Sequence, residues 1–109
     1  MYEQLINALK AVSGISFTEY AWATRPSSDY GVYQLDFEVG AVEGDNNKVQ
    51  RCYEGSVDAF IHAPNKELIE NIESALQSVC QGSWKLNSIQ YEQDARLLHY
   101  EWVFQLEVI

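Results

Sequence analysis

Basic residues are scarce in this chain of 109 residues. Seven lysines and arginines stand against sixteen aspartates and glutamates, which gives a formal net charge of −9. Surfaces that bind nucleic acids use lysine and arginine to displace counterions from phosphates, and anionic membranes attract polybasic segments. The composition therefore predicts neither specific nucleic-acid binding nor attachment to a membrane. Acidity by itself also keeps a protein in solution, so the charge alone does not identify a partner.

Long apolar runs and cysteine clusters are also missing. No apolar segment approaches the roughly 20 residues that a membrane-spanning helix needs. Residues 1–7 lack the basic start and the apolar block of a signal peptide, which predicts a chain without a secretory leader. The two cysteines, Cys52 and Cys80, are too few and too far apart for a disulfide framework or a metal knuckle. We expect both to be free thiols in a reducing compartment.

Catalytic motifs are absent as well. The sequence contains no P-loop, no GxGxxG, no HExxH and no paired CxxC. Ser56, Cys52 and Cys80 have none of the flanking residues that mark a nucleophile, and His62 and His99 stand without a motif that would make them general bases. We interpret all five as structural. The sequence therefore predicts a protein that is not an enzyme and that holds no cofactor.

The clearest pattern present is the C-terminal run of residues 98–109. Its even positions are large and apolar: Leu98, Tyr100, Trp102, Phe104, Leu106 and Val108. Most of its odd positions are polar: His99, Glu101, Gln105 and Glu107. A period of two over this length predicts a long strand with one dry face and one wet face. Such a strand needs a sheet beside it and a cover over its dry face.

Two segments have helical periodicity. Residues 2–12 place Leu5, Ile6, Leu9 and Val12 on one face and end at a Ser-Gly pair. Residues 65–80 begin at Asn65, a good N-cap, and repeat apolar residues at intervals of three and four. Gly82 stands where the end of a helix favours glycine.

Four further segments are predicted from their composition and alternation. We predict strands over 15–23, 33–39, 49–62 and 84–92, and a polar connection of hairpin type over 40–48. Gly55 lies inside the third strand, where it indicates a bulge or a close approach of another backbone. The predicted order is α-β-β-β-α-β-β, which favours an antiparallel arrangement. We therefore predict an α+β fold for 1–109 as a single domain, with a two-layer, mainly antiparallel sheet of about five strands and two helices on one face.

Acidic side chains collect on the wet faces of the predicted strands. They are joined there by both histidines: Asp36, Glu38, Glu54, Asp58, His62, His99, Glu101 and Glu107. Oxygen ligands of this kind suit calcium, magnesium or manganese, but no motif groups them in sequence. We therefore predict an acidic surface without a metal site. Trp84 and Trp102 alternate with apolar neighbours, which favours a place in the core over stacking on a ligand.

Two segments carry a resemblance to a known family. Residues 54–61 read EGSVDAFI and are followed by a helix rich in Glu, Leu and Ile; residues 91–100 read YEQDARLLHY and lead into the final strand. With the N-terminal helix and the charged connection 40–48, they resemble the tail-terminator or tail-completion (head–tail joining) proteins of long-tailed bacteriophages. In that family a variable polar stretch precedes a strand of the x-V-D-x-F/Y type, and a Y-x-x-D-x-x-x-x-H segment precedes the last strand.

The resemblance implies a structural subunit of virion assembly that is not an enzyme. Such subunits form an oligomeric ring, usually a hexamer, that caps the tail tube and meets the head connector. It also implies a location in the host cytoplasm during assembly and in the virion tail afterwards. In this role Asp36, Glu38, Glu54 and Asp58 would line the lumen of the ring. Glu43, Asp45 and Lys48 would bind a partner if 40–48 is an inter-subunit arm, and would be solvated if it is an ordinary loop.

Two other classes of protein fit the same sequence. A small ligand-binding or protein-interaction α+β domain would use the sheet face and should have a concave apolar pocket. A small hydrolase or metal-dependent enzyme should have a titratable pair at hydrogen-bond distance. An assembly subunit should instead expose a strand edge or a loop that a neighbouring chain covers.

Overall fold

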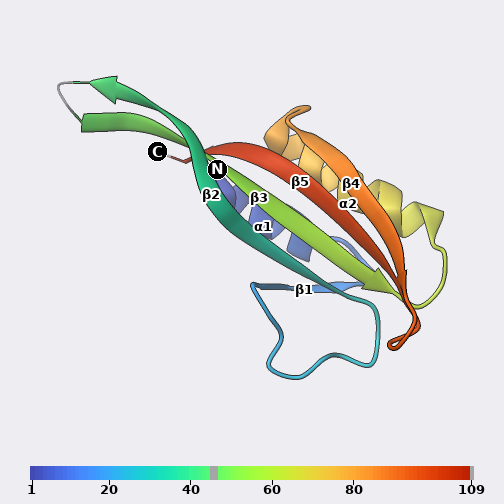
Figure 1. The fold of residues 1–109 in the computed structure, drawn as a ribbon. Coiled ribbons are helices and arrows are strands. Elements are labelled where there is room, and N and C mark those ends of the chain that lie inside the picture. The colour runs from blue at the N-terminus through green and yellow to red at the C-terminus, as the bar shows by residue number, and fades with distance from the viewer. Residues whose placement is uncertain (45–46, 109) are drawn as a thin grey trace.

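The computed structural model describes residues 1–44 and 47–108 and forms two layers (Figure 1). The elements in chain order are α1 (Tyr2–Lys10), β1 (Ser16–Glu19), β2 (Tyr30–Gly44), β3 (Asn47–Ile61), α2 (Lys66–Cys80), β4 (Trp84–Glu92) and β5 (Leu97–Val108). This is the predicted order of helices and strands, and it confirms the α+β fold. The molecule is elongated, with principal extents of 52 × 25 × 21 Å.

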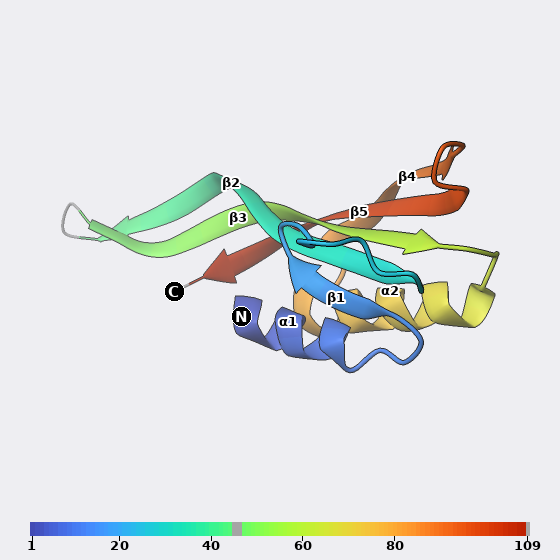
Figure 2. The ribbon, with the colours of Figure 1, turned by 90° about the horizontal axis from the view of Figure 1, so that it is seen from below.

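The five strands form one sheet in the order β1-β2-β3-β5-β4. Three of the four strand pairs are antiparallel, and β1 pairs with β2 in parallel. Both helices lie on one side of the sheet, as Figure 2 shows from below. The opposite side is free of helices, and we call it the open face. The prediction of two helices on one face of a mainly antiparallel sheet is therefore confirmed.

The core lies between the helices and the dry face of the sheet. Trp102, Phe104 and Leu106 of β5 are at most 3% exposed, as the alternation of that strand predicted. From the helices, Leu9 and Ile72 contribute fully buried side chains. A helix as short as α1 is marginal by itself in water, so this shared burial is what holds it on the sheet.

Helix α2 begins as predicted and ends one residue earlier than its glycine suggests. The side chain of Asn65 accepts a hydrogen bond from the backbone N–H of Leu68, at 3.1 Å. At the other end Gln81, and not Gly82, takes the first left-handed position, with φ 49°. Gly82 follows with φ 91°, so two residues in succession turn the chain into β4.

The first strand is shorter than predicted. We expected residues 15–23, but β1 ends at Glu19. Tyr20 has φ 64°, and the N–H of Ala21 donates to the carbonyl of Glu19 at 2.8 Å, which closes a tight turn over a single residue. The turn breaks the extended backbone, so the aromatic and small residues that follow form a loop.

Residues 40–48 were predicted as a polar connection of hairpin type; β2 and β3 do form a hairpin, but the strands extend farther into this segment than expected. Strand β2 continues to Gly44 and β3 begins at Asn47, and Gly44 faces Asn47 across the pair. This part of the β2–β3 pair extends beyond the two helices (Figures 1 and 2). A strand pair away from the helices need not carry the apolar alternation by which a half-buried strand is predicted.

Among the described residues, no helix is both long enough and apolar enough to span a membrane.

Candidate functional site

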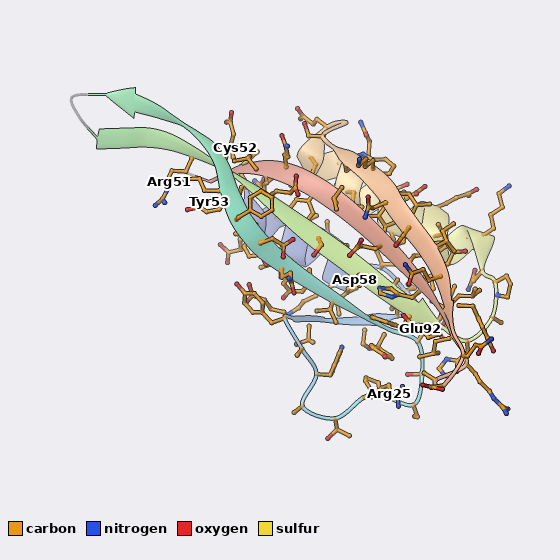
Figure 3. The ribbon with its side chains drawn as sticks, in the orientation of Figure 1. Arg25, Arg51, Cys52, Tyr53, Asp58 and Glu92 are labelled. Atoms are coloured by element: carbon orange, nitrogen blue, oxygen red, sulfur yellow. The ribbon has the colours of Figure 1, made fainter. Side chains whose placement is uncertain are left out.

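The open face of the sheet carries most of the predicted acidic residues. Asp58 of β3 lies directly opposite Glu101 of β5, and Glu54 lies opposite Gln105. Asp36 of β2 joins them because the amide of Gln34, on the same face, donates a hydrogen bond to its carboxylate. The structure therefore brings Asp36, Glu54 and Asp58 together on one bare surface, and Figure 3 shows Asp58 near the middle of the sheet.

His99 lies between two carboxylates on this face. Its Nε2 is 2.7 Å from Oδ1 of Asp58, and its Nδ1 is 2.9 Å from Oε1 of Glu92. The ring of Phe60 stacks on the imidazole at a centroid distance of 4.2 Å, and Tyr30 stacks on Phe60 at 4.8 Å. Only the protonated imidazole can donate from both nitrogens. The geometry therefore favours the imidazolium.

The pKa of His99 shifts in the direction that this geometry demands, whereas the pKa of Asp58 shifts opposite to what the pairing demands, because burial outweighs its pairing with His99. Burial lowers the pKa of His99, but the hydrogen bonds and charges of Asp58 and Glu92 raise it by more, so the net pKa is raised. Burial raises the pKa of Asp58, the bond to His99 opposes the rise, and the charges of Glu101 and Asp36 add to it. Each raised pKa means that the folded state holds its proton more tightly than the unfolded state does.

We predict that the contribution of His99 to stability fades with rising pH. A raised histidine pKa stabilises the fold in full below the unfolded pKa, about 6.5, and the contribution is lost as the pH rises through the folded value. His99→Gln should lower the free energy of unfolding by about 1–3 kcal/mol at about pH 5.5 and by clearly less at about pH 8.5. Urea titrations at the two pH values measure the difference.

The comparison is cleanest when His99 is the only histidine. The chain has two, and the other, His62, is exposed and contacts Asp29 away from the cluster. Both proteins should therefore carry His62→Gln. A loss of stability for His99→Gln that is equal at both pH values, or larger at the higher one, would contradict the pairing of a protonated His99 with Asp58 and Glu92.

Glu38 does not lie with the other predicted lumen residues. Register shifts between Leu35 and Phe37 and between Glu38 and Gly40 break the alternation of β2. Glu38 therefore lies opposite Tyr53, whose other neighbour is the buried Leu106, on the helix side of the sheet. There Glu38 forms an ion pair with Arg51. The prediction that Glu38 lies on the wet face was wrong, because it applied strict alternation to a strand that contains bulges.

The second feature is a two-stranded arm, formed by residues 39–44 of β2 and 47–50 of β3. Strand β1 pairs with β2 only over Tyr30–Tyr33, and β5 pairs with β3 only over Arg51–Ile61, so within the described chain the arm strands pair with each other alone. Glu43 and Lys48 are directly opposed in it. Asp45, the third predicted partner-binding residue, lies outside the described residues.

The other residues that the sequence analysis singled out, the possible metal ligands, Trp102 and the cysteines, do not form a binding site in the described part of the chain. Across residues 1–44 and 47–108, no group of three or more His, Cys, Asp or Glu side chains is arranged to hold a metal ion. Trp102 is fully buried, and Cys80 is buried with its pKa raised to about 11 by burial. Both cysteines are free thiols.

Sequence reasoning missed the contact between Glu92 and His99. The two residues flank the turn between β4 and β5, where Glu92 pairs with Leu97 and Gln90 pairs with His99. The predicted hairpin, folded about residues 93–96, would have placed them diagonally across the strands on one face. The register of that turn was therefore the available signal.

A scan against protein-family models finds no match to this chain, and no curated protein matches its sequence.

Proposed function

We propose that this protein is a structural subunit of a phage or prophage tail, which assembles with further copies into a ring at the head–tail junction. The observation that supports the proposal is the arm. A two-stranded ribbon without a third strand or a helix against it is at best marginally stable in water. Contact with a neighbouring chain supplies the missing cover, so the arm is suited to join subunits.

The free edge of β2 supports the same role. Within the described residues, the outer edge of β2 is paired only over Tyr30–Tyr33. Exposed strand edges offer unpaired backbone groups to another chain. Contacts that join different surfaces of identical subunits close into a ring when the rotation between subunits allows it.

The open face fits the lumen of such a ring. Asp36, Glu54, Asp58 and Glu101 carry carboxylates on this side, and the whole chain has a formal charge of −9. Lys85 also lies on this face, but a surface with so few basic residues gains little from counterion release, so DNA that passes it adheres weakly. The hexameric ring, the contacts with tail and head-connector proteins, and the passage from host cytoplasm to virion tail belong to this proposal through the family resemblance.

Both ring nitrogens of His99 contact carboxylates, which leaves neither of them for a nucleophile. This supports a role without catalysis, since a general base must reach the proton that it removes.

Shortening the arm tests the proposal. Replacing residues 42–50 with Asn-Gly leaves Ala41 facing Arg51 across a tight turn and keeps the pair of Glu38 and Arg51. We expect the full chain to form closed rings of more than two subunits, seen by sedimentation velocity and negative-stain microscopy. The shortened chain should keep its circular dichroism spectrum and form no ring.

A charge variant is the matched control for this experiment. Glu43→Gln with Lys48→Gln keeps the length of the arm and removes its one directly opposed charge pair, so ring formation should be weakened but not lost. Rings formed by the shortened chain, or no ring from the full chain at any concentration up to about 1 mM, would exclude the arm as the ring contact. Capsid and tail genes beside the coding region would separately support the phage assignment.

A ligand-binding module is the second candidate. A cleft of about 370 Å³ is lined among others by Arg25, Tyr30, Phe60 and Glu92, of which Phe60 and Glu92 contact His99. Figure 3 shows Arg25 and Glu92 at the same end of the molecule. Its volume is in the range of small-molecule sites, and the rings of Tyr30 and Phe60 in its lining suit a planar group. Absence of rings from the full chain would favour this candidate.

A further inference from the structure

Strand β4 is an edge strand with an apolar face that is exposed to solvent. It closes the sheet on one side, and within the described chain no strand pairs with its outer edge. On the helix side of the sheet its residues Leu86, Ile89 and Tyr91 are 37%, 55% and 58% exposed. Such an edge invites another strand, and natural proteins usually protect it with charges, prolines or bulges.

The protection of β4 covers only its first half. Lys85 and a register shift between Leu86 and Ser88 blunt the edge there. From Ser88 to Glu92 the pairing with β5 is regular, and the four residues 88–91 carry no charge. By contrast, β2 has three register shifts over its free part. The second half of β4 is therefore the regular, unprotected edge of this sheet.

Charge favours a second copy of the chain at this edge over most other places on the surface. Two chains with a formal charge of −9 repel each other over most of their surfaces. Strand β4 carries one positive and one negative residue, Lys85 and Glu92, and is neutral as a whole. Two copies that approach along β4 therefore meet less charge repulsion than two copies that approach at the acidic surfaces.

The sequence of β4 is complementary to itself in one antiparallel register. With Gln90 opposite Gln90 of the second copy, Tyr91 faces Ile89 on the helix side, and Glu92 faces Ser88 on the open face. Each contact occurs twice because the arrangement has two-fold symmetry. An aromatic residue opposite a β-branched residue is a favourable cross-strand pair. In this register every residue of 88–92 meets a partner on its own face of the sheet.

We propose that two copies of this chain associate through β4, antiparallel and around a two-fold axis at Gln90, to form one continuous sheet. The contact uses a different surface from the arm and does not depend on the proposed ring. The arm-shortened chain should form it equally well.

A cysteine at the axis tests the register. The parent protein carries Cys52→Ser, which leaves the buried Cys80 as its remaining thiol. Gln90→Cys brings two thiols to facing positions, where the Cα separation of an antiparallel pair is within the range of a disulfide. Mild oxidation should convert most of this variant into a species of twice the 12.5 kDa chain mass. Lys85→Cys is the control, because the two copies of residue 85 are roughly 30 Å apart in this register.

Analytical sedimentation of the chain without a crosslink tests whether the dimer forms through β4. Ile89→Lys and Tyr91→Lys change side chains that are more than half exposed, so the fold should be kept, as circular dichroism would show. Each should raise the dissociation constant of the dimer about 10-fold or more, because each substitution acts twice. Tyr20→Lys, at an equally exposed tyrosine on another surface, should leave it unchanged.

Monomers at all concentrations up to about 1 mM would overturn the proposal. So would a dimer that Ile89→Lys and Tyr91→Lys leave intact, or one that forms a disulfide at residue 85 and not at residue 90. A chain that dimerises through β4 and forms no ring would refute the proposed ring alone.

Discussion

Gly55→Ala should lower the free energy of unfolding by about 3 kcal/mol, the upper end of the range for overpacking a core. A Cβ at residue 55 would lie 2.5 Å from Cζ of Phe104 and within 3 Å of the backbone carbonyl of Gln34. Phe104 is 1% exposed, so its ring has no free space to move into. The carbonyl belongs to β2, the neighbouring strand, and it can move only if that strand moves.

The matched control is Gly40→Ala, at another strand glycine. A Cβ there meets no atom within 4 Å, so its stability should stay within about 0.5 kcal/mol of the parent protein. Urea unfolding of both variants and the parent measures the difference. Equal stabilities for the two variants would mean that the contact at residue 55 relaxes without cost.

A second substitution separates the two contacts at Gly55. Phe104→Leu removes the ring, and its combination with Gly55→Ala should cost less than the sum of the two single changes. The loss of stability that Gly55→Ala still causes in the Phe104→Leu background measures the contact with the carbonyl of Gln34. The sequence predicted a bulge or a close approach at Gly55. The structure shows the close approach at this residue and puts the bulge in the facing strand, between Leu35 and Phe37.

The elements that could be predicted from the sequence are those with one dry face and one wet face. Helix α2 and strand β5 each pack one side against the core, so their apolar residues repeat with the period of their own backbone. Strand β4 was predicted with its observed bounds, Trp84–Glu92, because its ends are marked by turn residues.

In the parts that could not be predicted, apolar residues do not repeat with the period of a helix or strand that has one buried side. The arm is paired as strand and extends beyond the helices (Figure 2), so the sequence did not distinguish its polar residues from a loop. Glu38 changed face because each bulge adds one residue and shifts the alternation that follows. The parallel pairing of β1 depends on four residues, too few to carry a periodic signal.

Trp102→Ala should cost about 3–5 kcal/mol, the range for removing a large aromatic side chain from a core. Trp102 is 0% exposed and lies between Val57 and Leu86 in the middle of the sheet. Its Nε1 donates to Oε2 of Glu73 in α2 at 2.9 Å, so the same side chain fills the core and ties the helix to the sheet. Alanine would leave a cavity and a carboxylate without its donor.

Trp84 offers a matched comparison, because its Nε1 also donates to α2, to Oε1 of Gln77 at 2.8 Å, from a partly exposed position. Trp84→Ala should cost about 1–2 kcal/mol, since less apolar surface leaves the core. Trp102→Phe keeps most of the packing and removes the donor, so it should fall between the two. Urea unfolding at one pH ranks the three variants. A penalty for Trp102→Ala no larger than that for Trp84→Ala would mean that the two-layer core does not depend on the central tryptophan.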